Sequence, residues 1–332
     1  MLFGALMLTL AASPEVALLS SRGDVAELRF QPLRGAEITA PIARFTHGEG
    51  SSVQGSLLPG TRVVVASATM RAGGDLSFAN SLLRLEAGKP ARVLADQLAY
   101  ASRPLVTAEG RVFVSRGAAG QEPFDGRDAL RVDALSVDEI DPVTAAHRTV
   151  YSTRGYVTFL AGAFGRELVV YEIAPAGARL IAVHVDTLAV RELLHSMLPM
   201  ARDFVIDVPG HRVLFTQHGA ESWLVEQVDL VSGVSTRLAE GAEVTMLPAV
   251  LTDGRVLISR GAGEGLSALD GRRVLASHGP GFERIAFQQK GLIVGLHERP
   301  GGFPSVFASK DGLVVTLLAP AESRLDVAGV IP

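Results

Sequence analysis

The chain has 332 residues, of which 48% are hydrophobic and 20% are charged, so it can bury a sizeable core. Its formal net charge of −4 at pH 7 and the lack of a strongly basic stretch exclude a general nucleic-acid-binding protein. The absence of cysteine excludes disulfide bonds, thiolate metal sites and a cysteine nucleophile.

The first apolar stretch, LFGALMLTLAA at residues 2–12, is typical of the core and cleavage region of a secretory signal. It is shorter than the about 20 residues that a membrane-spanning helix needs. No later stretch is long and apolar enough either, so no transmembrane span is expected. No Lys or Arg precedes Arg22, so we interpret residues 1–13 as a truncated signal and expect a periplasmic or extracellular protein. The alternative is an apolar first strand in a cytoplasmic protein.

A glycine-containing turn followed by an apolar run recurs six times along the chain. The copies are LLPGTRVVVA (57–66), TAEGRVFVS (107–115), GAFGRELVVY (162–171), DVPGHRVLF (207–215), LTDGRVLIS (251–259) and QQKGLIVGL (288–296). Their glycines are Gly60, Gly110, Gly165, Gly210, Gly254 and Gly291. Because tight hairpin turns need positive φ, which glycine adopts at little cost, each copy predicts a hairpin with a left-handed glycine.

A second strand–turn–strand unit follows each hairpin. These units span residues 81–95, 130–152, 179–194, 223–239, 265–277 and 305–319. Asp, Gly and Pro supply their turns, as at Asp141-Pro142. Each period therefore holds four short strands, which we name a, b, c and d in chain order. Only VRELLHSML (190–198) is also compatible with a short helix.

Four strands in each period of 40–50 residues are typical of a β-propeller blade. The average glycine spacing of about 46 residues predicts about seven blades, with six as the alternative if the N-terminal segment does not join the ring. Residues 15–45 read as strands b, c and d of one blade, and residues 323–332 as its strand a. We therefore expect one all-β propeller domain over residues 14–332, closed by strands from both termini, which would leave no open sheet edge.

The hairpin Thr252-Asp253-Gly254-Arg255 resembles the WD40-like PD40 repeats of TolB-type bacterial propellers. The turn VDLVSG (228–233) is similar to an outer turn that several propeller families share. Other copies replace the Asp by Glu109, Phe164, Pro209 or Lys290. True WD40 repeats are not expected, because the only tryptophan is Trp223 and no Trp-Asp pair occurs.

The resemblance implies that the b–c and d–a loops lie on one face around the central channel. These loops carry Ser-Arg-Gly at the ends of three b strands and further charged residues. The candidate binding residues are Arg22, Arg116, Arg154, Arg202, Asp203, His218, Arg260, His278, Arg284 and His297. Arginine's planar guanidinium suits a carboxylate, a phosphate or an acidic protein segment. The alternative, which the repetition itself favours, is that these arginines reflect repeat ancestry and a solvated rim.

Two polar, glycine-rich stretches, residues 68–80 and 116–131, are further candidate binding loops. Phe78 and Phe124 are their candidate anchors, although aromatic residues are more often tucked beneath such loops. The eight histidines lack the spacing of metal ligands, so no metal is predicted, and only a ring of histidines from several blades stays open. GAGEG (261–265) precedes another strand rather than a helix, so it is not a dinucleotide loop and no cofactor is predicted.

No catalytic motif such as G-x-S-x-G occurs in the sequence. The leading hypothesis is therefore a monomeric, non-catalytic binding scaffold that engages a protein or cell-envelope component through one loop face. The alternative is a glycan lyase or hydrolase with carboxylates and Arg or His at the channel mouth. The fold does not decide between them, because propellers host both functions.

Overall fold

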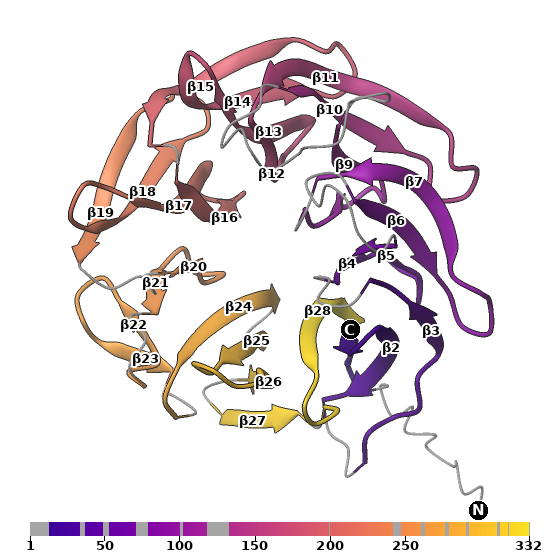
Figure 1. The fold of residues 1–332 in the computed structure, drawn as a ribbon. Coiled ribbons are helices and arrows are strands. Elements are labelled where there is room, and N and C mark those ends of the chain that lie inside the picture. Colours follow the sequence, from indigo (N-terminus) through magenta and orange to yellow (C-terminus); the bar gives the residue numbers. More distant parts are fainter. Residues whose placement is uncertain are drawn as a thin grey trace, which may run out of the picture.

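The computed structural model describes residues 13–33, 37–48, 53–70, 79–99, 102–117, 133–198, 200–241, 247–259, 263–275, 279–289, 292–310, 313–317 and 319–331. Within these ranges the chain forms 28 strands and no helix, so nothing helical there could span a membrane. The sheets stand in a ring around a central axis, which is the architecture of a β-propeller (Figure 1). Residues 1–12, most of the predicted signal, lie outside the described ranges.

Five sheets contain four antiparallel strands each. The first is β28 (Arg324–Ile331), β1 (Glu15–Arg22), β2 (Val25–Pro32) and β3 (Ala43–Thr46). The second is β12 (Val157–Phe164), β13 (Glu167–Ala174), β14 (Gly177–His184) and β15 (Val190–Met197); the third is β16 (Ala201–Asp207), β17 (Arg212–His218), β18 (Trp223–Asp229) and β19 (Ser235–Gly241). The fourth is β20 (Leu247–Val250), β21 (Val256–Ser259), β22 (Leu266–Ala268) and β23 (Arg273–Leu275); the fifth is β24 (Phe282–Gln289), β25 (Leu292–Glu298), β26 (Ser305–Lys310) and β27 (Leu313–Leu317). The stretch that is compatible with a helix is thus strand β15.

The remaining sheet has eight strands. They are β4 (Gln54–Leu57), β5 (Val64–Thr69), β6 (Asn80–Leu85), β7 (Arg92–Leu98), β8 (Leu105–Val106), β9 (Val112–Gly117), β10 (Asp133–Ile140) and β11 (His147–Gly155). Strands β7 and β9 pair at Leu98 and Arg116, and this contact merges β4–β7 with β8–β11. The prediction of seven separate four-stranded blades is therefore wrong: five blades are separate, because the β7–β9 pairing joins the other eight strands.

Strands from the two ends of the described chain close the ring. β1 pairs with β28 from Glu15 opposite Ile331 to Ser21 opposite Arg324, and β2 and β3 complete that sheet. Figure 1 shows β28 beside the axis, in the position that the first strand occupies in the other blades. The predicted closure is confirmed, and the six-blade alternative fails because residues 15–46 belong to the ring.

Four of the six predicted hairpin glycines have positive φ. The values are +67° at Gly60, +82° at Gly110, +57° at Gly165 and +82° at Gly254. In the fourth copy the left-handed residue is instead His211, at φ +52°. Glycine is needed next to it for space, because a Cβ on Gly210 would lie 2.2 Å from the Asp207 carboxylate. Gly291 lies outside the described residues.

The hydrophobic core lies between neighbouring sheets. One cluster combines Tyr171 and Leu180 of the β12–β15 sheet with Phe215 and Val228 of the next sheet. The largest fully buried side chains include Phe113, Phe215 and Phe307, each on a different sheet. Because each sheet buries apolar side chains on the faces that contact its neighbours, the ring positions the innermost strands rigidly around the axis.

Candidate functional site

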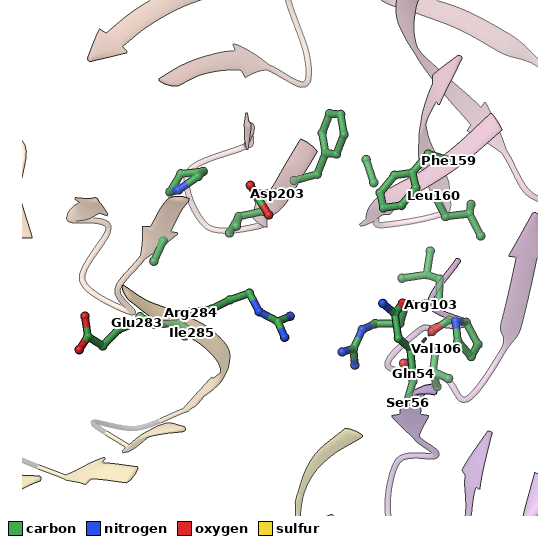
Figure 2. Close-up of a pocket in the computed structure, with 17 residues that line it drawn as sticks. Gln54, Ser56, Arg103, Val106, Phe159, Leu160, Asp203, Glu283, Arg284 and Ile285 are labelled. Carbon is green, nitrogen blue, oxygen red and sulfur yellow. Dashed lines mark hydrogen bonds between the residues drawn. The ribbon is translucent and has the colours of Figure 1, made fainter. Parts of the chain in front are cut away.

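A cavity of about 400 Å³ lies on the axis of the ring and is lined mainly by the innermost strands (Figure 2). The polar and charged lining residues are Gln54, Ser56, Arg103, Asp203, Glu283 and Arg284. The remaining ones are Pro104, Leu105, Val106, Phe159, Leu160, Ala161, Phe204, Val205, Pro248, Ala249 and Ile285. Because these residues come from six strands or the segments beside them, only the closed ring brings them together.

Three of the innermost strands have an irregular register where they line this cavity. The pairing shifts between Leu160 and Gly162 in β12, between Arg202 and Val205 in β16, and between Ile285 and Phe287 in β24. A β-bulge of this kind turns a side chain away from its regular alternation. The bulges therefore help to direct lining side chains toward the axis.

Asp203 occupies the bulge of β16 in a left-handed conformation, with φ +56°. Aspartate tolerates this region better than most residues because its side chain is short and polar. Its Oδ2 atom lies 3.1 Å from Arg202 Nε, yet it accepts no hydrogen bond within the described part of the chain. Burial raises the pKa of the Asp203 carboxyl above its usual value, although the charges of Arg202 and Arg284 oppose that increase.

Two arginines extend toward one another into the cavity from separate parts of the chain (Figure 2). Arg284 of β24 donates one hydrogen bond to Glu298 Oε1 at 3.3 Å. Arg103, in the segment before β8, donates to Gly55 O at 2.6 Å, to Val327 O at 3.2 Å and to the Asp326 carboxylate. Arg103 is therefore fixed by its contacts, whereas Arg284 has a single anchor among the described residues.

The opposite wall of the cavity is apolar. Phe159 and Phe204 lie side by side with ring centroids 5.8 Å apart. Phe204 also packs against Tyr171 and Phe215, at 5.4 Å and 5.5 Å, so that this wall is continuous with the core between two blades. The cavity thus combines a rigid aromatic wall with arginine and aspartate side chains.

The structure divides the sequence-predicted site residues into separate groups. Asp203 and Arg284 share the axial cavity. Arg202 stacks on Trp223, with its guanidinium carbon 4.4 Å from the ring centroid, and His218 packs against the same ring at 4.8 Å. Arg202 links these two pairs, because it also lies 3.1 Å from Asp203. Arg260 and His278 lie outside the described residues, as do Phe78 and Phe124.

Two other predicted arginines line a second cavity, of about 750 Å³, over β9, β10 and β11. Arg116 donates to Asp138 Oδ2 at 2.7 Å and to Asp96 O at 2.8 Å, so it holds the merged sheet together. Arg154 is exposed at the end of β11. Arg22 stands apart on the rim, where it pairs with Glu322 at 2.9 Å.

His297 has a structural environment. Its side chain is fully buried, with Nδ1 3.1 Å from Glu283 Oε1 and Nε2 3.2 Å from Pro280 O. The serines of the Ser-Arg-Gly tripeptides are buried too: Ser21 hydrogen-bonds His47 at 2.8 Å, and Ser259 accepts from Glu283 N at 3.2 Å. Two of the three repeated serines, Ser21 and Ser259, therefore make contacts between neighbouring strands and loops.

Arg103 and the aromatic wall were not among the site residues predicted from the sequence. Arg103 lies in a d–a connection, like several of the predicted residues, so its position in the repeat could have identified it as a candidate. Phe159 and Phe204 are apolar residues in apolar strands, and no pattern distinguishes them from core residues. Among the described residues no group of three or more His, Asp or Glu side chains could hold a metal ion.

No family model matches the sequence, and no curated protein matches it either. Solved structures do match. TolB from Acinetobacter baumannii has a TM-score of 0.51 at 11% identity, over 96% of this chain and 67% of that chain. The fold is that of TolB-type propellers. A nidogen/laminin complex matches at a TM-score of 0.51 and 10% identity, over 95% of this chain and 98% of that chain.

Propeller domains of peptidases match as well. A prolyl endopeptidase gives a TM-score of 0.60 at 12% identity, and the match covers 94% of this chain but only 50% of that one. At these identities the similarity establishes the fold, as the Asp-Gly-Arg hairpins predict, and leaves the function to the site itself.

Proposed function

We propose that this protein is a non-catalytic binding scaffold whose axial cavity receives an acidic segment of a partner protein. The observation that carries the proposal is the pair of guanidinium groups of Arg103 and Arg284, which enter one cavity from the segment before β8 and from β24 (Figure 2). Guanidinium groups bind carboxylates through directed, charge-assisted hydrogen bonds. A cavity of about 400 Å³ has room for a few side chains rather than a folded domain.

The surroundings of the two arginines support this proposal. Arg284 is 37% exposed in its side chain and donates to Glu298 alone within the described residues, so further N–H groups can reach a ligand. Arg103 is held by three contacts, so it loses little conformational entropy when a ligand binds. The Phe159–Phe204 wall offers an apolar surface for the rest of the segment.

Catalysis has less support. Glycoside hydrolysis needs two carboxyl groups that flank the scissile bond. Of the residues that line the cavity, only Asp203 and Glu283 carry carboxylates. Figure 2 shows the Glu283 carboxylate directed away from the space between Arg284 and Arg103, and it hydrogen-bonds buried His297. A single accessible carboxylate favours binding over hydrolysis.

Three broader features belong to the same proposal. We take residues 14–332 as one propeller domain, in which the eight-stranded sheet and the five four-stranded blades act as a unit. We take residues 2–12 as an export signal, so that the partner is a periplasmic or extracellular protein or another envelope component. Detection of the tagged full chain in the periplasmic or secreted fraction tests the last point, and retention in the cytoplasm contradicts it.

The binding site is tested with a dansyl-labelled peptide that contains three consecutive glutamates, measured by fluorescence anisotropy. The same peptide with glutamines serves as the reference. We expect the glutamate peptide to bind more tightly, and Arg284→Gln to weaken it by about tenfold, the value of one charge-assisted hydrogen bond.

Arg166→Gln is the matched control, because it removes the same charge from the β12–β13 turn, outside the cavity lining. Arg166 is 75% exposed and forms an ion pair with Asp186 alone among the described residues, at 2.6 Å, so its loss leaves peptide binding unchanged. Equal binding of the two peptides, or equal affinity of wild type and Arg284→Gln, would contradict the proposal.

A further inference from the structure

Each arginine near the axial cavity lies close to a carboxylate. Arg103 pairs with Asp326, Arg284 lies 3.3 Å from Glu298, and Arg202 lies 3.1 Å from Asp203. Among the described residues, three guanidinium groups therefore face three carboxylates, and Glu283, which lies beside His297, adds a fourth carboxylate. A ligand that only adds negative charge gains no long-range attraction from this set, so recognition depends on where each charge lies.

Positively and negatively charged side chains reach the cavity at different places. Glu298 and Asp326 belong to the surroundings of the arginines and do not line the cavity, whereas Asp203 does line it. Figure 2 shows the Asp203 carboxylate on the β16 side, apart from the guanidinium groups of Arg284 and Arg103. The cavity thus offers donors at one place and a carboxylate acceptor at another.

The Asp203 carboxylate is poorly satisfied by the protein itself. Its side chain is only 25% exposed, and its Oδ2 atom is buried without a hydrogen bond from any described residue. The Arg202 guanidinium, the closest cation, stacks on Trp223, and its Nε–H does not align with Oδ2. Because Oδ2 itself is buried, a cationic or amide donor on a ligand approaches this carboxylate from the exposed quarter of the side chain, which lines the cavity, and adds a partner there.

We infer that Asp203 is the residue that determines specificity in the cavity, and that the segment bound there carries a lysine or other amine beside its acidic residue. This inference rests on the proposed function and narrows it from an acidic segment to a zwitterionic one. Arg284 and Arg103 hold the carboxylate of the ligand, while Asp203 accepts a hydrogen bond from its ammonium group. The β16 bulge gives Asp203 this role, because it turns residues 203 and 204 out of the regular register.

The test uses dansyl-labelled peptides in which a glutamate is followed by lysine or by glutamine, with zero, one or two glycines between them. We expect the wild-type protein to prefer the lysine peptide by about fivefold at the best spacing, as a partly buried charge pair provides. Asp203→Asn removes the charge and keeps the size, and asparagine also tolerates positive φ, so this variant folds. In it the preference falls below about twofold, so that the remaining preference is worth less than about 0.5 kcal/mol.

Asp253→Asn is the control, since Asp253 lies in the β20–β21 turn and contacts only Arg255 there. It should keep the preference of the wild type. Equal binding of the lysine and glutamine peptides at every spacing, or an unchanged preference in Asp203→Asn, overturns the inference and leaves the proposed function intact. Failure of every glutamate peptide to bind wild type overturns both.

Discussion

Arg103 and Asp326, 223 positions apart in sequence, form an ion pair beside the axial cavity. Asp326 lies in the closing strand β28, and its second carboxylate oxygen accepts a hydrogen bond from Gly55 N at 2.9 Å. Arg103 donates to the carbonyl oxygens of Gly55 and Val327 as well. One pair of side chains therefore links the closing strand to β4 and to the segment before β8, and the closure of the ring and the geometry of the cavity depend on the same contacts.

Asp326→Ala should destabilise the fold by about 3 kcal/mol, because it leaves a partly buried guanidinium and the Gly55 N–H without their acceptor. The Asp326 side chain is only 6% exposed. Urea unfolding followed by tryptophan fluorescence measures the change. Glu322→Ala serves for comparison: its partner Arg22 is 71% exposed, so its loss costs less than about 1 kcal/mol. Similar losses of unfolding free energy in the two variants would show that the Arg103–Asp326 pair does not stabilise the closure of the ring.

Gly254→Val should cost about 1–2 kcal/mol. Gly254 has φ +82°, and no atom lies within 4 Å of the position of a Cβ, so the penalty comes from the backbone conformation alone. The neighbouring exposed residue Thr252 lacks positive φ, and Thr252→Val should stay within about 0.5 kcal/mol of wild type. Chemical unfolding of both variants gives the comparison, and a neutral Gly254→Val would contradict the left-handed turn.

His297→Ala should be more damaging than any exposed histidine substitution, with a loss of about 3 kcal/mol. The side chains of His297 and Glu283 are both fully buried and lie 3.1 Å apart, so the substitution removes a partner from a buried carboxylate. His147→Ala provides the exposed counterpart and should change stability by less than about 0.5 kcal/mol. Thermal melts of the two variants that coincide would exclude a structural role for His297.

The free energy of unfolding should depend on pH through Asp203. Since burial raises the pKa of its carboxyl in the folded state, the native protein binds this proton more tightly than the unfolded chain does. Stability from this group therefore falls as the pH rises from the ordinary aspartate range through the raised native value. Asp203→Asn lacks this titration and should be more stable than wild type near pH 7, by about 1 kcal/mol.

The advantage of Asp203→Asn should shrink as the pH is lowered and the wild-type carboxyl becomes protonated. Urea unfolding at a series of pH values measures the difference between the two proteins. Asp253→Asn is again the control: hydrogen bonds from Arg255 lower the pKa of Asp253, so its substitution gives the opposite pH trend or none. A constant difference between wild type and Asp203→Asn would show that Asp203 titrates as in the unfolded chain.

The turns of this protein could be predicted from local sequence because they depend on local backbone geometry. Gly254 needs positive φ, and Asp229 in the VDLVSG turn accepts hydrogen bonds from Val231 N and Ser232 N within three residues. Such signals repeat with each blade. Their spacing along the sequence therefore predicted both the all-β propeller and its closure by residues 323–332. The merging of β7 with β9 did not, because a single pairing at Leu98 and Arg116 leaves no periodic mark.

The sequence by itself determined the repeated strands, the turns and the strand that closes the ring, since hydrophobic period and turn chemistry act over a few residues. Only the tertiary structure decided which polar residues meet. Arg103, Asp203 and Arg284 lie in three different strands or loops, and a bulge and a ring closure direct them into one cavity. His297, another of the predicted site residues, lies near the end of β25 and is buried against Glu283 instead, because long-range packing decides whether a histidine near a strand end faces solvent or the interior.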